Sequence, residues 1–319
     1  MLICLHAGAH KTASTYVQSR LMEERDRLAG AGIGVVAHGF FRRQVSDRLD
    51  AAGGLGGVGY AIAKTSLKRP LAKMVEFHAA RERVIMSDEN LAGSMIGAIG
   101  PDGLYPEARR RVGAALDALP KACDRTLFFA VRSYAAYYSS IYVYRREKRE
   151  AREVETFRRS ALELKRGWAE VVSDLCAAAG ADRVVVWTYD EFAKRPARIN
   201  AALLGEGAPR IFAKTDRASL PSLSRKGLAV LDRVSDMLSE SEHAGLARAI
   251  ARFQFDKPDE KFSLFTPDEL DALDARYRSD LDSISALGCK VIRTERRTVD
   301  ADEEPAEETS GPENARPAA

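Results

Sequence analysis

The sequence predicts an α/β fold with three layers: a central, mostly parallel sheet flanked by helices, followed by a helical C-terminal part. Three observations predict it. Short apolar runs alternate with segments of helical periodicity, as parallel strands joined by crossover helices require. The first run leads through a glycine-containing turn into a helix, which is how phosphate-binding loops are built. From about residue 215 the pattern is mainly helical.

The bulk properties suit a soluble globular protein. The chain has 319 residues, of which 45% are hydrophobic and 30% charged. No run approaches the roughly 18 apolar residues of a membrane span, and because the chain enters its first predicted strand at Leu2, we expect no signal peptide. The four cysteines form no C-x-x-C pair, which favours reduced thiols in a cytoplasmic protein and no metal cluster.

The net charge of +3 is unevenly spread. Residues 299–319 carry seven acidic side chains and one arginine, so we expect a single domain over 1–298 and a disordered acidic tail over 299–319. The remaining chain is basic, which suits an anionic ligand or an acidic polymer. We expect a small anionic ligand and no nucleic acid. The sequence does not set the oligomeric state.

In the first half of the chain, apolar runs predict strands and apolar periodicity predicts helices. The apolar run after Met1 is a strand, and the helix that follows ends before Gly30 and Gly32. Pro70 fits the first turn of a later helix, and Pro106 opens another. The expected elements are strand 2–5, helix 14–28, strand 33–37, helix 70–81, strand 83–86 and helix 106–119.

The second half continues the alternation. The run ending at Val131 reads as a strongly buried strand, and a helix around Trp168 stops at Gly180. Ser224 is a plausible cap for one C-terminal helix, and Thr266 with Glu269 forms the start signal of another. The expected elements are strand 126–131, helix 135–149, helix 159–178, strand 183–187 and a helix from 266 to about 286.

A glycine-rich stretch at 53–59 contains a G-x-G-x-x-G match. The dinucleotide fingerprint requires a strand directly before it, and residues 46–50 do not form one. We therefore expect a mobile loop there, a possible flap over the site.

The turn between the first strand and the first helix predicts an anion site. Backbone N–H groups and the helix dipole attract anions, Lys11 adds a charge, and Thr12, Ser14 and Thr15 add hydroxyl donors. The Walker pattern G-x-x-x-x-G-K-[ST] is incomplete, because Leu5 and His10 replace its glycines. A phosphate-like ligand fits this turn better than a standard nucleoside triphosphate does.

Polar residues follow directly after four of the expected strands: Lys11, Glu89, Arg132 and Tyr189. Ligands of open α/β sheets bind outside the carboxyl ends of the strands. Four separate stretches therefore point to one site.

These residues resemble the PAPS-dependent sulfotransferase family, which uses 3′-phosphoadenosine 5′-phosphosulfate (PAPS), and in particular its bacterial carbohydrate-type members. Their opening motif H-x-G-x-x-K-T-[GA]-[ST]-T-x-x-Q matches from His6 to Gln18, with Ala13 where glycine is more usual. A strand-end arginine followed eight residues later by a serine matches Arg132 and Ser140, and Y-[ED]-[ED]-[LF] matches from Tyr189 to Phe192. The resemblance covers roughly residues 2–290 and implies a P-loop NTPase-like fold.

The resemblance implies sulfuryl transfer from PAPS to a hydroxyl of an acceptor, a saccharide or glycolipid, with 3′-phosphoadenosine 5′-phosphate as the other product and no metal. Lys11 would neutralise charge on the bridging oxygen. Arg132 and Ser140 would bind the 3′-phosphate, and Tyr189 would lie near the adenine. The 5′-phosphosulfate would be held by the turn residues Gly8, Ala9, His10, Lys11, Thr12, Ala13, Ser14 and Thr15.

A general base would take the proton of the acceptor hydroxyl. We favour Glu89, with Asp88 as its nearest rival and His6 and His10 as further candidates. Arg225 and Lys226, in an R-K-G triplet, are secondary candidates for phosphate contacts. The aromatic and basic helix 137–149 either lines an acceptor groove or is a half-buried amphipathic helix.

Two other functions stay open. A P-loop kinase would use the stretch from Val84 to Glu89 as a Walker B strand and would need Mg²⁺, but the broken Walker A motif and the Arg132–Ser140 pair argue against it. A non-catalytic nucleotide-binding protein would bind 3′-phosphoadenosine 5′-phosphate without sulfating any hydroxyl.

Overall fold

The computed structural model describes residues 1–319 except 55, 101, 150–152, 214–222, 254–261 and 295–319. The predicted acidic tail at 299–319 lies outside the described residues. Six strands form one fully parallel sheet in the order β2-β3-β1-β6-β7-β8. The strands are β1 (Leu2–His6), β2 (Ile33–Val36), β3 (Arg83–Ser87), β6 (Asp124–Val131), β7 (Val184–Thr188) and β8 (Lys290–Ile292).

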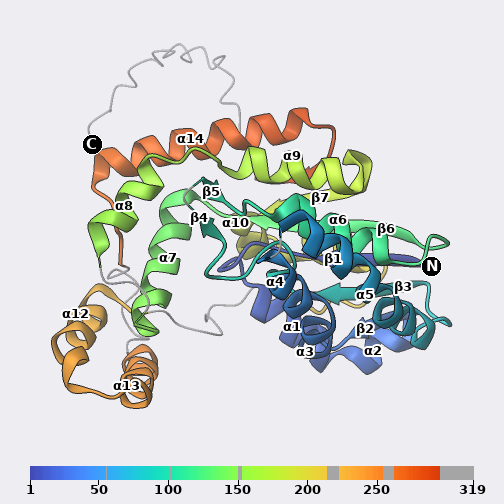
Figure 1. The fold of residues 1–319 in the computed structure, drawn as a ribbon, viewed down its shortest axis with the longest axis horizontal. Coiled ribbons are helices and arrows are strands. Elements are labelled where there is room, and N and C mark those ends of the chain that lie inside the picture. Colours follow the sequence, from blue (N-terminus) through green and yellow to red (C-terminus); the bar gives the residue numbers. More distant parts are fainter. Residues whose placement is uncertain (55, 101, 150–152, 214–222, 254–261, 295–319) are drawn as a thin grey trace, which may run out of the picture.

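Helices cover both faces of this sheet, as the sequence predicts (Figure 1). Alternate residues of a strand enter opposite apolar cores: in β1, Ile3 and Leu5 enter one core and Cys4 the other. The core around Cys4 is closed by α1 (Ser14–Glu23), α2 (Arg25–Gly30), α10 (Tyr189–Lys194) and α11 (Pro196–Leu204). The other core is closed mainly by α5 (Gly56–Phe77), α6 (Ala108–Ala118), α7 (Tyr134–Glu147), α9 (Trp168–Ala179) and α14 (Pro267–Ala286).

Two predicted helices are each divided into two in the structure. The helix expected at 14–28 breaks at Glu24 into α1 and α2, and the helix expected at 159–178 is α8 (Val154–Leu162) followed by α9. Strand β8 and the short hairpin of β4 (Ile99–Gly100) and β5 (Gly103–Leu104) were not predicted, because each is only two or three residues long.

The prediction of a mobile loop at 53–59 is wrong. Its described residues join two helices, α4 (Asp47–Gly53) and α5, which are preceded by α3 (His38–Phe41) and a π-helix η1 (Arg42–Ser46). Gly56 has a φ of +59° and turns the chain between α4 and α5. Tyr60 and Leu67 of α5 are buried in the core, so packing stabilises a helix that its glycines disfavour.

Pro70 lies inside α5, and not in the first turn of a helix as predicted. Proline cannot donate to the carbonyl four residues earlier, which is that of Ser66. Arg48 of α4 donates to this carbonyl instead, at 3.3 Å. The neighbouring helix thus satisfies the group that the proline leaves free.

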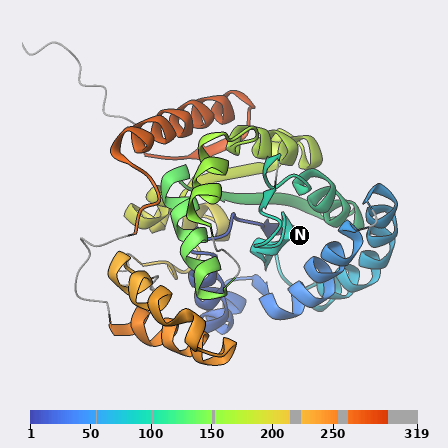
Figure 2. The ribbon, with the colours of Figure 1, turned by 60° about the vertical axis from the view of Figure 1, so that its left-hand side comes forward.

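The C-terminal helices attach to the domain at two places (Figures 1 and 2). Helix α14 lies along α9, and the capping box predicted from Thr266 and Glu269 is confirmed. Helices α12 (Arg225–Val234) and α13 (Glu240–Phe253) lie beside the carboxyl end of α7. None of the helices in the described ranges is long and apolar enough to cross a membrane.

Asp280 of α14 is the buried link between α14, α9 and α7. Its carboxylate accepts the Tyr134 hydroxyl, the Trp168 N–H at 2.9 Å and the guanidinium of Arg276 at 2.9 Å. The residue is 4% exposed. Removing a carboxylate from such a set leaves buried donors without an acceptor.

We therefore expect Asp280→Ala to lower the free energy of unfolding by about 3–5 kcal/mol. Urea unfolding followed by tryptophan fluorescence measures this. Asp282→Ala is the control, because Asp282 forms an exposed ion pair with Arg293, and losing such a pair costs at most about 1 kcal/mol. Equal costs for the two variants would contradict this reading of Asp280.

Candidate active site

The site begins where β1 passes into α1. The ladder between β1 and β6 continues past the strand end, since Ala7 N–H donates to Phe128 O at 2.9 Å and Ala9 N–H to Ala130 O at 3.1 Å. A Cβ at Gly8 would lie 2.8 Å from His6 Nε2 and 3.3 Å from Ala130 Cβ. Only glycine allows this close approach of the turn to β6.

Two non-glycine residues of the turn adopt left-handed backbone conformations: Lys11 with a φ of 62° and Ala13 with a φ of 69°. In the part of the chain that the structure describes, the backbone N–H groups from Lys11 to Tyr16 have no hydrogen-bond partner. Successive free N–H groups in such a turn form a concave anion site. Ala13 is the position at which the resembling family more often has glycine, and its φ gives the reason.

The three hydroxyls expected to donate to an anion differ in their surroundings. Ser14 Oγ is buried and has no hydrogen-bond partner among the described residues. Thr12 Oγ1 donates to Ala9 O at 2.5 Å, so its proton is already used within the turn. Thr15 is exposed. Ser14 is therefore the hydroxyl that is available to a ligand inside the turn.

Lys11 turns its side chain toward α7. Its Nζ lies 5.0 Å from the centroid of the Tyr144 ring, in a cation–π contact. Burial lowers the pKa of Lys11, and Arg132 lowers it further, whereas the charge of Glu147 raises it. The ammonium thus lies against an aromatic ring of α7, and the charge of Glu147 on the same helix acts on it.

Arg132 joins the turn to the end of β7. Its Nη1 donates to Lys11 O at 2.8 Å, and its guanidinium lies 4.5 Å from the centroid of the Tyr189 ring. Its Nε is buried without a partner among the described residues. Tyr277 of α14 has a similarly unpartnered hydroxyl, and the charge of Arg132 acts on the pKa of this group.

Ser140 lies on α7 and is half-buried. It precedes Tyr144 by four residues, so both share one face of the helix, and Tyr144 contacts Lys11. No hydrogen bond joins Ser140 to Arg132 in the described ranges. Ser140 therefore lies on the face of α7 that borders the turn.

The two predicted carboxylates follow β3 and are both paired. Asp88, which is 0% exposed, accepts Nε and Nη2 of Arg42 at 3.0 and 2.6 Å. Glu89 accepts Gln18 Nε2 at 2.6 Å and Arg42 Nη2 at 2.9 Å. Burial would raise the pKa of Glu89, but its own backbone N–H, Arg42 and Gln18 together lower it.

His10 is fixed in one tautomer by its neighbours. The Tyr105 hydroxyl oxygen accepts hydrogen bonds from the backbone N–H of His10 at 2.9 Å and from the Tyr137 hydroxyl at 3.1 Å. The Tyr105 hydroxyl therefore donates its proton to His10 Nδ1, which is 2.8 Å away. The His10 Nε2–H donates to Asn90 Oδ1 at 2.9 Å, and burial lowers the pKa of the ring. With both ring nitrogens engaged, His10 has no atom left for an acceptor proton.

The basic cluster of α7 serves structure more than ligand binding. Tyr137, Tyr138 and Tyr142 are buried in the core, which corrects the idea that the helix as a whole lines an acceptor groove. Arg146 pairs with Asp232, and Arg149 donates to the Leu238 carbonyl at 2.7 Å. These arginines attach α12 and α13 to α7.

Arg225 and Lys226 begin α12, which Ser224 caps as predicted by accepting the Gly227 N–H at 3.1 Å. Both side chains are exposed. Leu223, two residues before Arg225, donates its N–H to the Glu147 carboxylate. The triplet therefore lies near the end of α7 and remains a secondary candidate.

Four residues of this site escaped the sequence analysis: Arg42, Tyr105, Glu147 and Tyr277. Arg42 belongs to the stretch that carried no readable pattern, and Tyr105 and Tyr277 look like ordinary core aromatics. Glu147 could have been found, because it stands seven residues after Ser140 and so falls on the same helix face.

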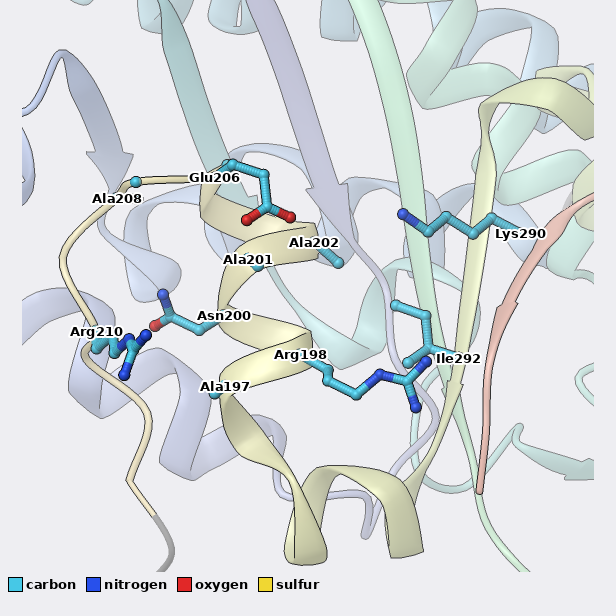
Figure 3. A pocket seen from close by; sticks show the side chains of 12 residues that line it. Ala197, Arg198, Asn200, Ala201, Ala202, Glu206, Ala208, Arg210, Lys290 and Ile292 are labelled. Carbon is cyan, nitrogen blue, oxygen red and sulfur yellow. The ribbon is translucent and has the colours of Figure 1, made fainter. Parts of the chain in front are cut away.

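A separate cavity of about 520 Å³ lies between α11, β8 and residues 205–210 (Figure 3). Arg198, Lys290 and Glu206 line it. It lies along α11 and the edge strand β8, and β6 and β7 separate β8 from β1 and its turn. It contains none of the predicted site residues.

The sequence matches no protein-family model and no curated protein. Three solved structures are similar. The sulfotransferase domain of the Synechococcus PCC 7002 olefin synthase is 13% identical over 87% of this chain and 94% of that one, with a TM-score of 0.40. A sulfotransferase from Alicyclobacillus acidocaldarius is 14% identical over 78% and 95%, with a TM-score of 0.35.

The sulfotransferase domain from the curacin biosynthetic pathway is 12% identical over 87% and 97% of the two chains, with a TM-score of 0.39. TM-scores and identities this low do not carry a conclusion about this chain. The function proposed below therefore rests on the residues of the site.

The backbone conformation at Ala13 gives a test of the turn. An L-residue in the left-handed region costs about 1–2 kcal/mol, which glycine avoids. We expect Ala13→Gly to raise the free energy of unfolding by about 0.5–1 kcal/mol after the greater freedom of glycine in the unfolded chain is counted. The same change at Ala229, exposed within α12, should lower stability by about 1 kcal/mol. Urea unfolding measures both, and equal signs would contradict the assigned conformation.

His6 gives a pH-dependent test. It is 1% exposed, stacks on Trp187 and contacts Ser87 Oγ at 2.9 Å. Burial lowers its pKa to about 4, against the opposing charge of Glu89. In the unfolded chain the His6 imidazole is protonated as the pH falls below about 6.5, whereas in the folded chain it stays neutral down to about pH 4. The free energy of unfolding therefore falls between these two pH values, by about 3 kcal/mol in all.

We expect His6→Gln to reduce the loss of stability between pH 7 and pH 4.5 by about 2 kcal/mol. Urea unfolding at both pH values measures it. His38→Gln, at an exposed position, is the control and should leave the pH dependence as it is in the wild type. An unchanged pH dependence in His6→Gln would show that this ring is not held neutral by burial.

Proposed function

We propose that this chain is a sulfotransferase that moves a sulfuryl group from PAPS to a hydroxyl of an acceptor, a saccharide or glycolipid, by in-line displacement. The observation that carries the proposal is a set of unpartnered buried donors around one turn. Ser14 Oγ and Arg132 Nε have no partner among the described residues, and both border the free N–H groups of the turn. Buried donors without partners are rare and point to a missing acceptor.

The residues present fit a ligand with two anionic groups. The turn, with its N–H groups and Ser14, suits a 5′-phosphosulfate. Arg132, with Ser140 and Tyr277 as further donors, suits a 3′-phosphate. Tyr189, stacked on Arg132, offers an aromatic ring beside that second position, where we place the adenine.

When bound, PAPS supplies the sulfuryl group. Lys11 would leave the Tyr144 ring and place its ammonium against the bridging oxygen, where negative charge builds up as the S–O bond breaks. Arg132 donates a hydrogen bond to the backbone carbonyl of Lys11, so the two cationic residues are linked. An anion bound by Arg132 would therefore also help to fix the position of Lys11.

Glu89 is the base predicted from the sequence. Both of its oxygens are engaged, by Gln18 and by Arg42, and its pKa is lowered. A carboxylate with a lowered pKa is a weak base. To accept a proton, Glu89 would first have to lose one of these partners.

The surroundings of Asp88 bear on the alternative of a P-loop kinase, which would need this carboxylate for Mg²⁺. Arg42 holds the Oδ1 of Asp88 with two hydrogen bonds, and the buried Oδ2 has no partner among the described residues. The incomplete Walker A motif, and not Asp88, argues against a kinase. The four cysteines are free thiols, which suits the reducing cytoplasm that we propose as the location.

Calorimetry with 3′-phosphoadenosine 5′-phosphate tests the function. We expect binding of equal strength with Mg²⁺ and with EDTA. Lys11→Ala and Arg132→Ala should each weaken it by about tenfold or more, since a hydrogen bond to a charged group contributes about 1.5–3 kcal/mol.

Lys290→Ala is the control, because Lys290 is exposed on the edge strand β8, which β6 and β7 separate from β1. It should leave the affinity unchanged. If ATP binds with the same affinity as 3′-phosphoadenosine 5′-phosphate, or if nucleotide binding requires Mg²⁺, the proposal is wrong and a kinase is favoured.

A further inference from the structure

The connection between β6 and α7, which carries Arg132, is fixed by one buried tryptophan. Only Arg132 and Ser133 lie between the end of β6 and the start of α7 at Tyr134. Trp168, the first residue of α9, contacts this connection with two of its N–H groups. Its indole Nε1 donates to Arg132 O at 2.8 Å, and its backbone N–H donates to the Tyr134 hydroxyl at 2.6 Å. Trp168 therefore holds the backbone from which the Arg132 side chain extends.

Trp168 has a closely packed position of its own. It is 0% exposed, and its ring stacks on the Tyr134 ring at 5.9 Å and meets the edge of the Tyr137 ring at 4.9 Å. Its backbone N–H also lies 2.9 Å from the buried carboxylate of Asp280. Because a buried indole N–H needs a partner, the place of this ring and the place of the Arg132 carbonyl depend on each other.

Gly167 lets α9 begin this close to α7 and α14. A Cβ at Gly167 would lie 2.5 Å from Asp280 Oδ2 and closer still to the Tyr134 hydroxyl. The φ of Gly167 is −105°, which any residue can adopt. Space, and not backbone conformation, therefore requires glycine here. The start of α9 is thus shaped to bring Trp168 against Arg132 O.

The contacts of the Arg132 side chain add to this support. Its Nη1 donates to Lys11 O at 2.8 Å, and its guanidinium lies 4.5 Å from the centroid of the Tyr189 ring. Its Nε is buried and has no partner among the described residues. A guanidinium binds a phosphate best with two parallel hydrogen bonds, which need a fixed plane. Arg132 is held for this at its carbonyl, at Nη1 and on one face.

We propose that Trp168 is the positioning residue that makes this chain select a nucleotide with a 3′-phosphate. The inference rests on the proposed function, in which Arg132 binds that phosphate. Trp168 does not touch the nucleotide and acts through Arg132, whose backbone it holds at the end of β6. The 5′-group binds at the turn through Ser14 and the free N–H groups, which Trp168 does not support.

Calorimetry on the full-length chain tests this with two nucleotides, 3′-phosphoadenosine 5′-phosphate and adenosine 5′-monophosphate (AMP), which lacks the 3′-phosphate. The ratio of their affinities measures what the 3′-phosphate contributes. Trp168→Phe keeps an aromatic ring in the core and loses the indole N–H. We expect this variant to bind 3′-phosphoadenosine 5′-phosphate about tenfold more weakly and AMP within about twofold of the wild type, because the weakened contact is a hydrogen bond between Arg132 and a charged group.

Trp187→Phe is the matched control. Trp187 is also buried, at 1% exposed, but it lies in β7, stacks on His6 and belongs to the other core. The same loss of volume there should leave the ratio of affinities as it is in the wild type. Thermal melting shows whether both variants are folded. Replacing Trp168 by β-(3-benzothienyl)alanine, which keeps the shape of the ring and has sulfur in place of the N–H, should lower the ratio in the same way.

An unchanged ratio in both Trp168 variants would overturn the inference. So would an equal loss of affinity for the two nucleotides, because that result belongs to a residue that supports the fold as a whole. A fall of the ratio in Trp187→Phe as large as in Trp168→Phe would overturn it as well. A wild type that binds AMP as tightly as 3′-phosphoadenosine 5′-phosphate, or binds neither, would instead contradict the proposed function itself.

Discussion

The close contact between the turn and β6 is the constraint on which the site depends. Two backbone hydrogen bonds carry the parallel ladder beyond β1, and the missing side chain of Gly8 lets the chain pass His6 and Ala130. The chain must then reverse into α1 within a few residues. It does so with left-handed conformations at Lys11 and Ala13. The free N–H groups and the unpartnered Ser14 hydroxyl follow from this path, because no strand or helix neighbour can reach them.

Helix α7 contacts three different parts of the molecule with three of its sides. Its tyrosines at 137, 138 and 142 fill the core, and its terminal arginines attach α12 and α13. The remaining face, from Ser140 to Glu147, borders the turn. A helix that is packed on two sides has little freedom to move, so the residues on its third side are well positioned. Precise positioning of this kind is what catalysis requires of a supporting scaffold.

The sequence could predict the sheet and the turn because both depend on local patterns. Apolar runs such as the one ending at Val131 can only be buried strands, and polar residues after them must gather at the carboxyl edge. The helices between 38 and 69 could not be predicted, and the helix expected to begin at Pro70 is the end of the longer α5. Their glycines and Pro70 disfavour helix locally, and burial of Tyr60 and Leu67 overrides this preference. Arg42 was missed for the same reason, since its partners Asp88 and Glu89 lie more than forty residues away in sequence.

The charges of the site argue for a ligand that carries more than one negative group. Burial lowers the pKa of both Lys11 and Arg132, and the charge of Arg132 lowers that of Lys11 further. The groups that oppose this effect include two carboxylates, Glu147 and Asp190, and two aromatic rings, Tyr144 and Tyr189. Two partly buried cations close together are costly. An anion at the turn and another at Arg132 would compensate both.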